Sequence, residues 1–399
     1  MNLGGVAVIS IHVTSLLVFA VFHLWLNSRS SIDNITEYES PTFDNRRGLI
    51  RIGSFAIFSL GGPMLFAVKG FNWLVVYYVA LSVARIISAS FVRWITNKSP
   101  AMGLRLFQLS PICIVASAAV PWSSNFLFEE FIIIMPMLNG VYIGGFWILL
   151  HDVNEFQGRN ADDHQYTECA SSIIGAVFAA TTSIIFGIEI SVAASGLVVL
   201  LGSMIPHNVD HRAFSKKLDL WNDEADVRQD NQVINAIVIV VAIAAMDWTA
   251  LSTLRIDSLI GESIIDGVIT LAVALAYAEA IGYTITRFFD VDVSNWGFKL
   301  IACILSLTGF SLMLIGPYWT PFGYLLTSTS GRVYFRLLDR KTARAGLRGI
   351  GKGVGTREFI RYSSFILCLP LLALHGLIPI IGILGVIFLY FTKSEYNKR

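Results

Sequence analysis

Arg85 stands inside a long apolar stretch of this sequence, where a charged side chain needs a physical reason to be. It shares one helical face with Tyr78 and Ser82, at spacings of three and four residues. A charge at the middle of a bilayer costs roughly 2.5–3.5 kcal/mol, so Arg85 must face a bundle interior or a water-filled cavity. We interpret Arg85 as a cation that holds an anionic or polar substrate. The alternative is a structural partner for a buried acid.

Two carboxylates occupy comparable positions in the second half of the chain. Asp247 stands beside Trp248 deep in one apolar stretch, and Glu279 follows Tyr277 far into the next. Because burial disfavours the ionised form, a carboxylate at such a position can take up and release a proton. We therefore predict proton exchange at Asp247 and Glu279, with structural ion pairing as the alternative for each.

A mixed polar and aromatic face completes the set of candidate substrate contacts. On a helix, Asn139 and Tyr142 align with Met135 and Phe146. Such a face suits a substrate cavity and equally suits a packed core. Together with the residues around Arg85, it gives the predicted substrate-binding residues, which are Arg85, Tyr78, Ser82, Asn139 and Tyr142.

The composition indicates an integral membrane protein built from helices. Of the 399 residues, 55% are hydrophobic and 14% are charged, whereas a soluble domain carries about 25% charged residues. The apolar runs are continuous and do not alternate as in an outer-membrane barrel, and lipid leaves such backbones only helical pairing. The net charge of +1 indicates no nucleic-acid partner. The four cysteines are scattered and indicate neither a zinc site nor a disulfide framework.

The chain is organised around a polar stretch at residues 207–232, with six apolar segments on each side of it. We predict four regions: an extra N-terminal transmembrane helix with a cytoplasmic linker (1–48), a six-helix bundle (49–206), a cytoplasmic linker between bundles (207–232) and a second six-helix bundle (233–399). After a first span at 3–27, the expected spans are 49–68, 71–95, 105–121, 125–151, 168–187, 189–206, 233–253, 258–288, 296–316, 317–336, 358–375 and 376–392.

The distribution of basic residues predicts the orientation of these thirteen spans. Of the 29 Lys and Arg residues, all except Lys69, Arg85 and Arg255 fall in or beside loops on one side. Basic residues are retained on the cytoplasmic side of a membrane. We therefore expect the N-terminus outside and the C-terminus in the cytoplasm. The expected location is a bacterial inner membrane.

A family resemblance appears between residues 138 and 187. A glycine-rich segment there leads to a loop with the pair Gly158-Arg159, followed by a segment with a stripe of small residues. This stretch resembles the region of the fourth and fifth helices in the major facilitator superfamily. The resemblance implies an all-α protein with two pseudo-symmetric six-helix bundles that move by alternating access. The first helix would be additional to the usual twelve.

The same resemblance implies gating residues at the cytoplasmic helix ends. The two loops at the corresponding places read SASFVRWITNK and GYTITRFF. They keep Arg93 and Arg287 and lack the family's aspartate. Arg93, Arg159 and Arg287 are therefore the predicted gating residues.

The small-residue stripe has two interpretations. Ser171, Gly175, Ala179, Ser183 and Gly187 recur every four residues. Small residues let helices approach closely in a bilayer. The stripe can serve static packing, or it can form a sliding surface between the two halves of a transporter.

No catalytic motif, metal site or cofactor site is indicated. The stretch GLRGIGKG at 346–353 ends in glycine where a P-loop needs Ser or Thr. The leading hypothesis is a proton-coupled secondary transporter whose partners are a small-molecule substrate, protons and the lipid bilayer, with contact to a membrane partner through the first helix left open. The alternatives are a membrane enzyme or flippase acting on lipid or lipid-linked glycan, and a purely structural role.

Overall fold

The computed structural model describes residues 42–69, 71–124, 133–157, 161–206, 209–210, 212–214, 264–288, 296–315 and 319–344, together with positions 366, 380, 383, 384 and 387. Within these ranges the regular elements are helices and there is no strand, which confirms the all-α prediction. In chain order the helices are α2 (Asn45–Lys69), α3 (Phe71–Lys98), α4 (Pro100–Ser124), α5 (Ile134–Phe156), α6 (Ala161–Phe186), α7 (Ile188–Met204), α10 (Ile264–Phe288), α11 (Trp296–Ile315) and α12 (Thr320–Arg344).

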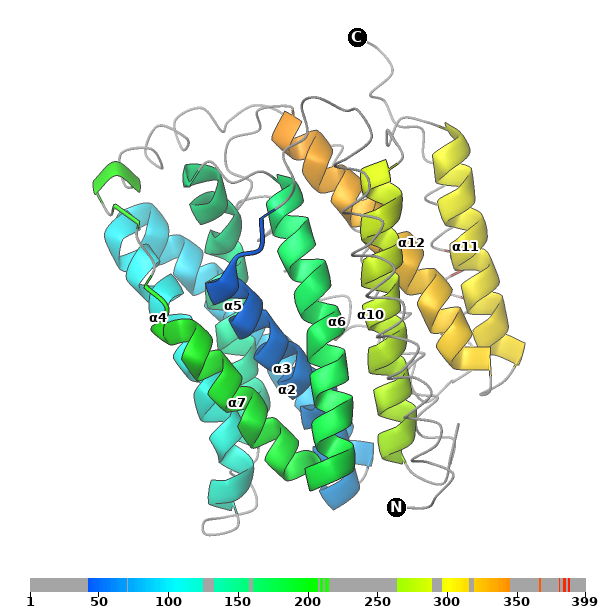
Figure 1. The fold of residues 1–399 in the computed structure, drawn as a ribbon, viewed down its shortest axis with the longest axis horizontal. Coiled ribbons are helices and arrows are strands. Elements are labelled where there is room, and N and C mark those ends of the chain that lie inside the picture. Colours follow the sequence, from blue (N-terminus) through cyan, green and yellow to red (C-terminus); the bar gives the residue numbers. More distant parts are fainter. Residues whose placement is uncertain are drawn as a thin grey trace.

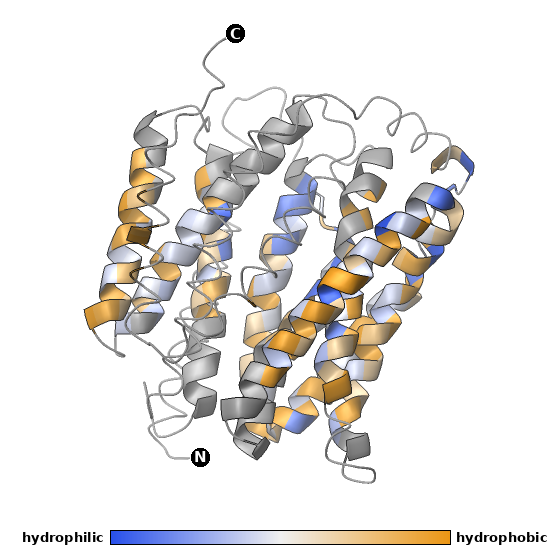
Figure 2. Ribbon diagram, turned by 180° about the vertical axis from the view of Figure 1, so that it is seen from behind, coloured by the Kyte–Doolittle hydropathy of each residue, from blue (hydrophilic) through white to orange (hydrophobic). Residues whose placement is uncertain are grey.

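The length and composition of these helices suit a bilayer. Helices α3, α4 and α6 each contain a segment long and apolar enough to cross a membrane, and α5, α7, α10 and α11 contain shorter apolar segments. Helix α11, at the left edge of Figure 2, is hydrophobic along most of its length. The predicted spans 3–27, 233–253, 358–375 and 376–392 lie outside the continuously described ranges. The count of thirteen spans therefore stays a prediction.

The described helices gather into two groups, which meet mainly where α6 packs against α10. Figure 1 shows α2 to α7 on one side and α10 to α12 on the other, with α6 and α10 side by side between them. In the first group, α5 packs against both α3 and α4. In the second group, α12 packs in the same order against both α10 and α11.

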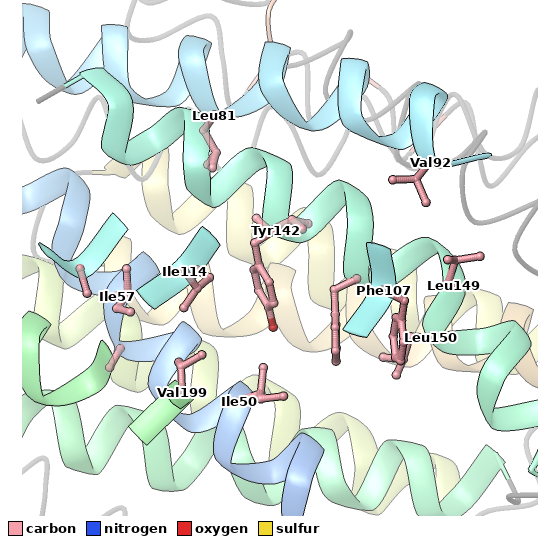
Figure 3. Packing of buried hydrophobic residues seen from close by; sticks show 14 of the residues in the cluster. Ile50, Ile57, Leu81, Val92, Phe107, Ile114, Tyr142, Leu149, Leu150 and Val199 are labelled. Atoms are coloured by element: carbon pink, nitrogen blue, oxygen red, sulfur yellow. The ribbon is translucent and has the colours of Figure 1, made fainter. Parts of the chain in front are cut away.

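The first apolar core contains side chains from each of the helices α2 to α7. It is rich in aromatic and branched side chains, and Figure 3 shows Tyr142 projecting from α5 into it, between Ile114 and Phe107 and toward Ile50. The rings of Tyr142 and Phe146 stack at a centroid distance of 5.3 Å, and those of Phe107 and Phe146 stack at 4.9 Å. This core fixes α5 at the centre of the first group.

A second, smaller core lies where α6 meets α10, with Phe55 of α2 at its edge. Its α6 side includes Cys169, Ala176 and Ala180, and its α10 side includes Ala276 and Ala280 among other buried residues. We call this contact the α6–α10 seam. Because many of its residues are small, the two helices can approach closely in lipid.

The predicted small-residue stripe on α6 lies mainly on a different face from this seam. A Cβ added at Gly175 would lie 2.8 Å from the carbonyl oxygen of Ile52 in α2. Ala179 likewise belongs to the first core. At these positions the stripe therefore serves packing within the first group, whereas the seam uses neighbouring residues such as Ala176.

Two helices extend beyond the limits expected from hydropathy. Helix α2 begins at Asn45, within the predicted linker 1–48, because the carboxylate of Asp44 accepts a hydrogen bond from the backbone N–H of Arg47 (3.2 Å) and so caps the helix. Helix α12 continues to Arg344, well past the expected limit of 336. The start of the predicted linker 207–232 also packs on the protein, because Phe214 is fully buried in the first core.

Candidate functional site

The centre of α12 carries a run of buried hydroxyl side chains. Residues 327–330 are Thr-Ser-Thr-Ser, and all four are at least nine-tenths buried. Thr327 and Thr329 each donate a hydrogen bond to the carbonyl four residues earlier, at 3.0 and 2.7 Å. These bonds satisfy hydroxyl groups that lipid could not.

A hydrogen bond between α11 and α12 indicates the depth of this polar run. Ser306 donates to Ser330 over 2.8 Å. Helix α11 has 20 residues, which at about 1.5 Å per residue matches the roughly 30 Å thickness of the hydrocarbon core. Since Ser306 lies near the middle of α11, Ser330 lies near mid-depth as well. Arg332 follows two residues later, about 3 Å further along the axis.

An ion pair joins α10 to α12 at this depth. The Nε atom of Arg332 lies 2.9 Å from Oε1 of Glu279. The Glu279 side chain is 2% exposed, whereas the Arg332 side chain is 29% exposed. The acid is thus covered by protein, whereas the base is partly exposed. Because a guanidinium in lipid is costly, we infer that the exposed part of Arg332 faces water.

A glycine on α10 allows this pairing. A Cβ added at Gly282 would meet the Cβ of Arg332 at 3.1 Å, so a larger residue would push α12 away. Glu279 is also close to the α6–α10 seam, because Ala276 and Tyr283 lie three and four residues away on the same face of α10. Across the seam, the rings of Tyr283 and Tyr166 stand 6.0 Å apart. The ion pair therefore lies beside the contact between the two groups of helices.

The predicted substrate residues lie in another place, on α3 and α5. Arg85 is 8% exposed and Ser82 is fully buried, both on α3. A Cβ added at Gly140 of α5 would come within 2.9 Å of the backbone nitrogen of Arg85, so this stretch of α3 faces α5. Tyr78 is half-buried beside Tyr77. The structure therefore brings the predicted residues of α3 and α5 to one helix pair.

Asn139 and Tyr142 are both fully buried on α5. The Nδ2 group of Asn139 donates a hydrogen bond to the hydroxyl of Tyr77 (3.1 Å), a residue that the sequence did not single out. The other amide atom of Asn139, Oδ1, has no hydrogen-bond partner among the described residues. Tyr142 is part of the first core and stacks on Phe58 of α2 at 6.3 Å.

A polar cluster ties the beginning of α2 to the beginning of α6. Arg51 lies 3.7 Å from Glu168, and His164 Nε2 lies 3.9 Å from the same carboxylate. Arg47 is hydrogen-bonded to Nδ1 of His164. We call Arg47, Arg51, His164 and Glu168 the α2–α6 cluster.

The backbone before α2 adds to this connection. The amide of Thr42 donates to the carboxylate of Asp163 over 2.6 Å, and the amide of Asp44 donates to the hydroxyl of Thr167 over 3.1 Å. Arg46, which precedes the expected span 49–68, is buried in the same region. Burial lowers the pKa of its guanidinium, and the neighbouring Asp44 partly opposes this shift.

The predicted gating and proton residues are described only in part. Arg93 is half-buried on α3, and Arg287 belongs to α10 without a described side chain. Arg159 and Asp247 lie outside the described residues. Arg332 was not among the predicted site residues, although the run TSTSGR at 327–332 interrupts an apolar segment and marks its place. Across the described ranges, no three His, Cys, Asp or Glu residues form a group that could hold a metal ion.

The arrangement of helices is shared with solved structures of other proteins. No protein-family model and no curated protein matches the sequence. Solved structures do match in fold, and this likeness agrees with the resemblance to the major facilitator superfamily that the sequence suggested. The apolar helices and this fold define an integral membrane protein.

Two solved structures illustrate the match. A point mutant of the nucleoside transporter NupG has a TM-score of 0.54 and 11% sequence identity, covering 87% of this chain and 98% of its own. The D-xylose-proton symporter has a TM-score of 0.54 and 11% identity, covering 89% of this chain and 98% of its own. At this identity the likeness concerns the fold and not the substrate.

Proposed function

We propose that this protein is a secondary active transporter, which moves a small molecule across the membrane by alternating access and couples that movement to protons. The fold supports this proposal, because the two matched structures are a nucleoside transporter and a proton symporter. The helix packing supports it too. Helices α3 to α5 and α10 to α12 repeat one packing order, as expected of two pseudo-symmetric bundles with the boundaries 49–206 and 233–399.

The observation that carries proton coupling is the Glu279–Arg332 ion pair. A covered carboxylate at mid-depth can bind a proton, and its partner arginine stabilises the ionised form. Uptake of a proton would remove the charge of Glu279. It would thereby weaken the ion pair that joins α10 to α12 beside the α6–α10 seam. Protonation would thereby favour one arrangement of the seam over another. Asp247 is proposed as a second proton site.

The other predicted roles fit a cycle in which the seam opens and closes. Arg85, Tyr78, Ser82, Asn139 and Tyr142 are proposed to contact substrate. Ser82, Asn139 and Tyr142 are fully buried in this structure. Contact with substrate would therefore need another conformation, in which α3 and α5 lie further apart. Arg93, Arg159 and Arg287 are proposed to act at the cytoplasmic gate.

Reconstitution into liposomes that contain a pH-sensitive dye tests the proposal. We expect some members of a panel of sugars, nucleosides, amino acids and organic acids to drive proton entry through the wild-type protein. Glu279→Gln should abolish solute-driven proton entry while solute exchange continues, because glutamine mimics the protonated acid. Glu189→Gln, the same change at an exposed acid in the first turn of α7, should behave as wild type.

Two results would contradict the proposal at different points. Proton entry that continues unchanged in Glu279→Gln would remove the role of Glu279. If the wild-type protein moved no solute of the panel under any gradient, the transporter function itself would be wrong.

A further inference from the structure

The Arg332 guanidinium contacts Glu279 through its Nε atom. This atom lies 2.9 Å from Oε1 of Glu279 in an ion pair, and in the described part of the chain no second ion pair involves Arg332. The guanidinium has five N–H donors in a rigid fork, and the two terminal amino groups form the edge that binds carboxylates in a bidentate manner. The side chain is 29% exposed, and we take its exposed part to include that edge.

We infer that Arg332 binds the carboxylate of a monoanionic substrate while Glu279 takes up one proton, so that the two enter together without net charge. This inference rests on the proposed transport function and names the substrate class of the same site. The Glu279–Arg332 pair is neutral while the acid is ionised. An anion that bound the open edge would leave one uncompensated negative charge near mid-depth. Protonation of Glu279 removes that charge, and charge burial in lipid is too costly to be left unbalanced.

The same charge balance selects among anions. A phosphate monoester carries a charge of about −1.5 to −2 at pH 7, which one arginine and one proton do not neutralise. A carboxylate carries one negative charge and matches the planar fork. The hydroxyl run next to Arg332, at 327–330, is bonded to its own helix and to α11, so it contributes a polar wall and no charge. The site therefore suits a monocarboxylate.

In the described part of the chain, the titratable groups that α2, α6 and α12 bring toward α10 are paired or ordinarily uncharged. From α6, Tyr166 and Cys169 reach the seam as uncharged side chains. From α2, Arg51 lies over the ring of Phe55, 5.7 Å from its centroid, and is paired with Glu168. From α12, Arg332 is the charged partner of Glu279. We therefore assign the charge exchange to Glu279, Arg332 and the substrate.

Binding to the purified full-length protein in detergent tests this inference. The probes are benzoate and lactate, each compared with its neutral amide, and inorganic phosphate. We expect the two carboxylates to raise the thermal unfolding temperature and the amides to leave it unchanged. Carboxylate affinity should rise by about tenfold per pH unit on acidification, over the pH range in which binding takes up one proton. Glu279→Gln should bind carboxylates tightly at every pH.

Variants of Arg332 provide the decisive comparison. Arg332→Gln should lose carboxylate binding, and Arg332→Lys should bind more weakly because it lacks the fork. The double variant Glu279→Gln with Arg332→Gln has no charge at either position. It should therefore fold even if Arg332→Gln alone does not, and it should still fail to bind carboxylates. Arg105→Gln, a change at an exposed arginine of α4, is the matched control and should bind as wild type.

Several outcomes would overturn the inference. They are equal binding of benzoate and benzamide, carboxylate binding that survives in the double variant, and Arg332-dependent binding of phosphate in preference to carboxylates. The liposome assay separates this inference from the transport proposal. Proton-coupled movement of neutral solutes without carboxylate binding would leave the transporter standing and refute the monocarboxylate site. Arg332-dependent carboxylate binding without any solute movement would support the site and refute transport.

Discussion

At the scale of single residues, the hydrogen bond between Asn139 and Tyr77 joins the side chains of α5 and α3. Both side chains are almost fully buried. In membrane proteins such bonds contribute about 0.6 kcal/mol on average and up to about 1.7 kcal/mol, because the unfolded chain in lipid also finds partners. We expect a coupling free energy in this range from a double-mutant cycle of Tyr77→Phe and Asn139→Leu, measured by unfolding in mixed micelles with SDS.

The cycle has a matched control on α3. Ser82→Ala removes a buried hydroxyl that has no hydrogen-bond partner in the described structure. Its effect on the free energy of unfolding should add to that of Asn139→Leu without coupling. A coupling free energy near zero for the Tyr77–Asn139 pair would show that the two side chains do not bind each other.

At the scale of elements, the glycines of α5 determine how closely it approaches α3. A Cβ at Gly140 would lie 2.5 Å from the carbonyl oxygen of Leu81, and a Cβ at Gly144 would lie 2.8 Å from the backbone nitrogen of Ala89. Backbone atoms cannot move aside, so Gly140→Ala and Gly144→Ala should each destabilise the protein by about 1–3 kcal/mol. Gly145→Ala is the matched control, since its nearest neighbour, the Cβ of Ser110, is 3.3 Å away. Equal destabilisation by all three would contradict the α3–α5 packing.

The α2–α6 cluster yields a prediction about charge balance. Glu168 faces Arg51 and His164, and Arg47 is close behind. Glu168→Gln would leave Arg51 and His164 without the acid that they face. Because the pair is partly exposed, we expect a loss of only about 1–2 kcal/mol in the free energy of unfolding. The charge-matched double variant, Arg51→Gln with Glu168→Gln, should lose less than the single variant. A double variant that is less stable than Glu168→Gln would show that the arginine stabilises the fold on its own.

The sequence predicts the elements well for a physical reason. Apolar runs of about twenty residues must form helices in lipid, and the structure confirms helices over most of the expected spans that it describes. The ends of helices are predicted less well. Hydropathy places the end of one span at 336, because the following stretch LLDRKTAR at 337–344 is rich in charge, whereas backbone bonding continues α12 to Arg344. Arg332 is consequently mistaken for a residue beside a loop.

The candidate site is predicted only in part. Burial of a carboxylate singles out Glu279, yet its pairing with Arg332 depends on how α10 and α12 are rotated about their axes. In a membrane the lipid-facing and protein-facing sides of a helix are both apolar, so hydropathy carries little information about rotation. For the same reason a polar face such as that of Asn139 and Tyr142 cannot be assigned to a cavity or a core from the sequence. The roles of Arg85, Asp247 and the three gating arginines stay predictions.

At the scale of the whole molecule, the α6–α10 seam joins the two groups of helices. It contains many small side chains together with Tyr166 and Tyr283, and the Glu279–Arg332 pair lies beside it. Small residues let helix backbones approach closely in lipid. A seam of this kind suits the rocking of one bundle against the other around a fixed site.

The cysteine in this seam offers a direct test of that motion. Cys169 is buried between α6 and α10, with 1% of its surface exposed. In a variant that keeps only Cys169, the membrane-permeant reagent N-ethylmaleimide should label the protein slowly at rest. The labelling rate should rise several-fold when a proton gradient and a transported solute drive turnover, because the thiol reacts only when exposed. A variant that keeps only Cys113, a half-buried residue of α4, should be labelled at the same rate with and without the gradient. If turnover left the labelling of Cys169 unchanged, the two bundles would not part at this seam, and the rocking motion would have to occur elsewhere.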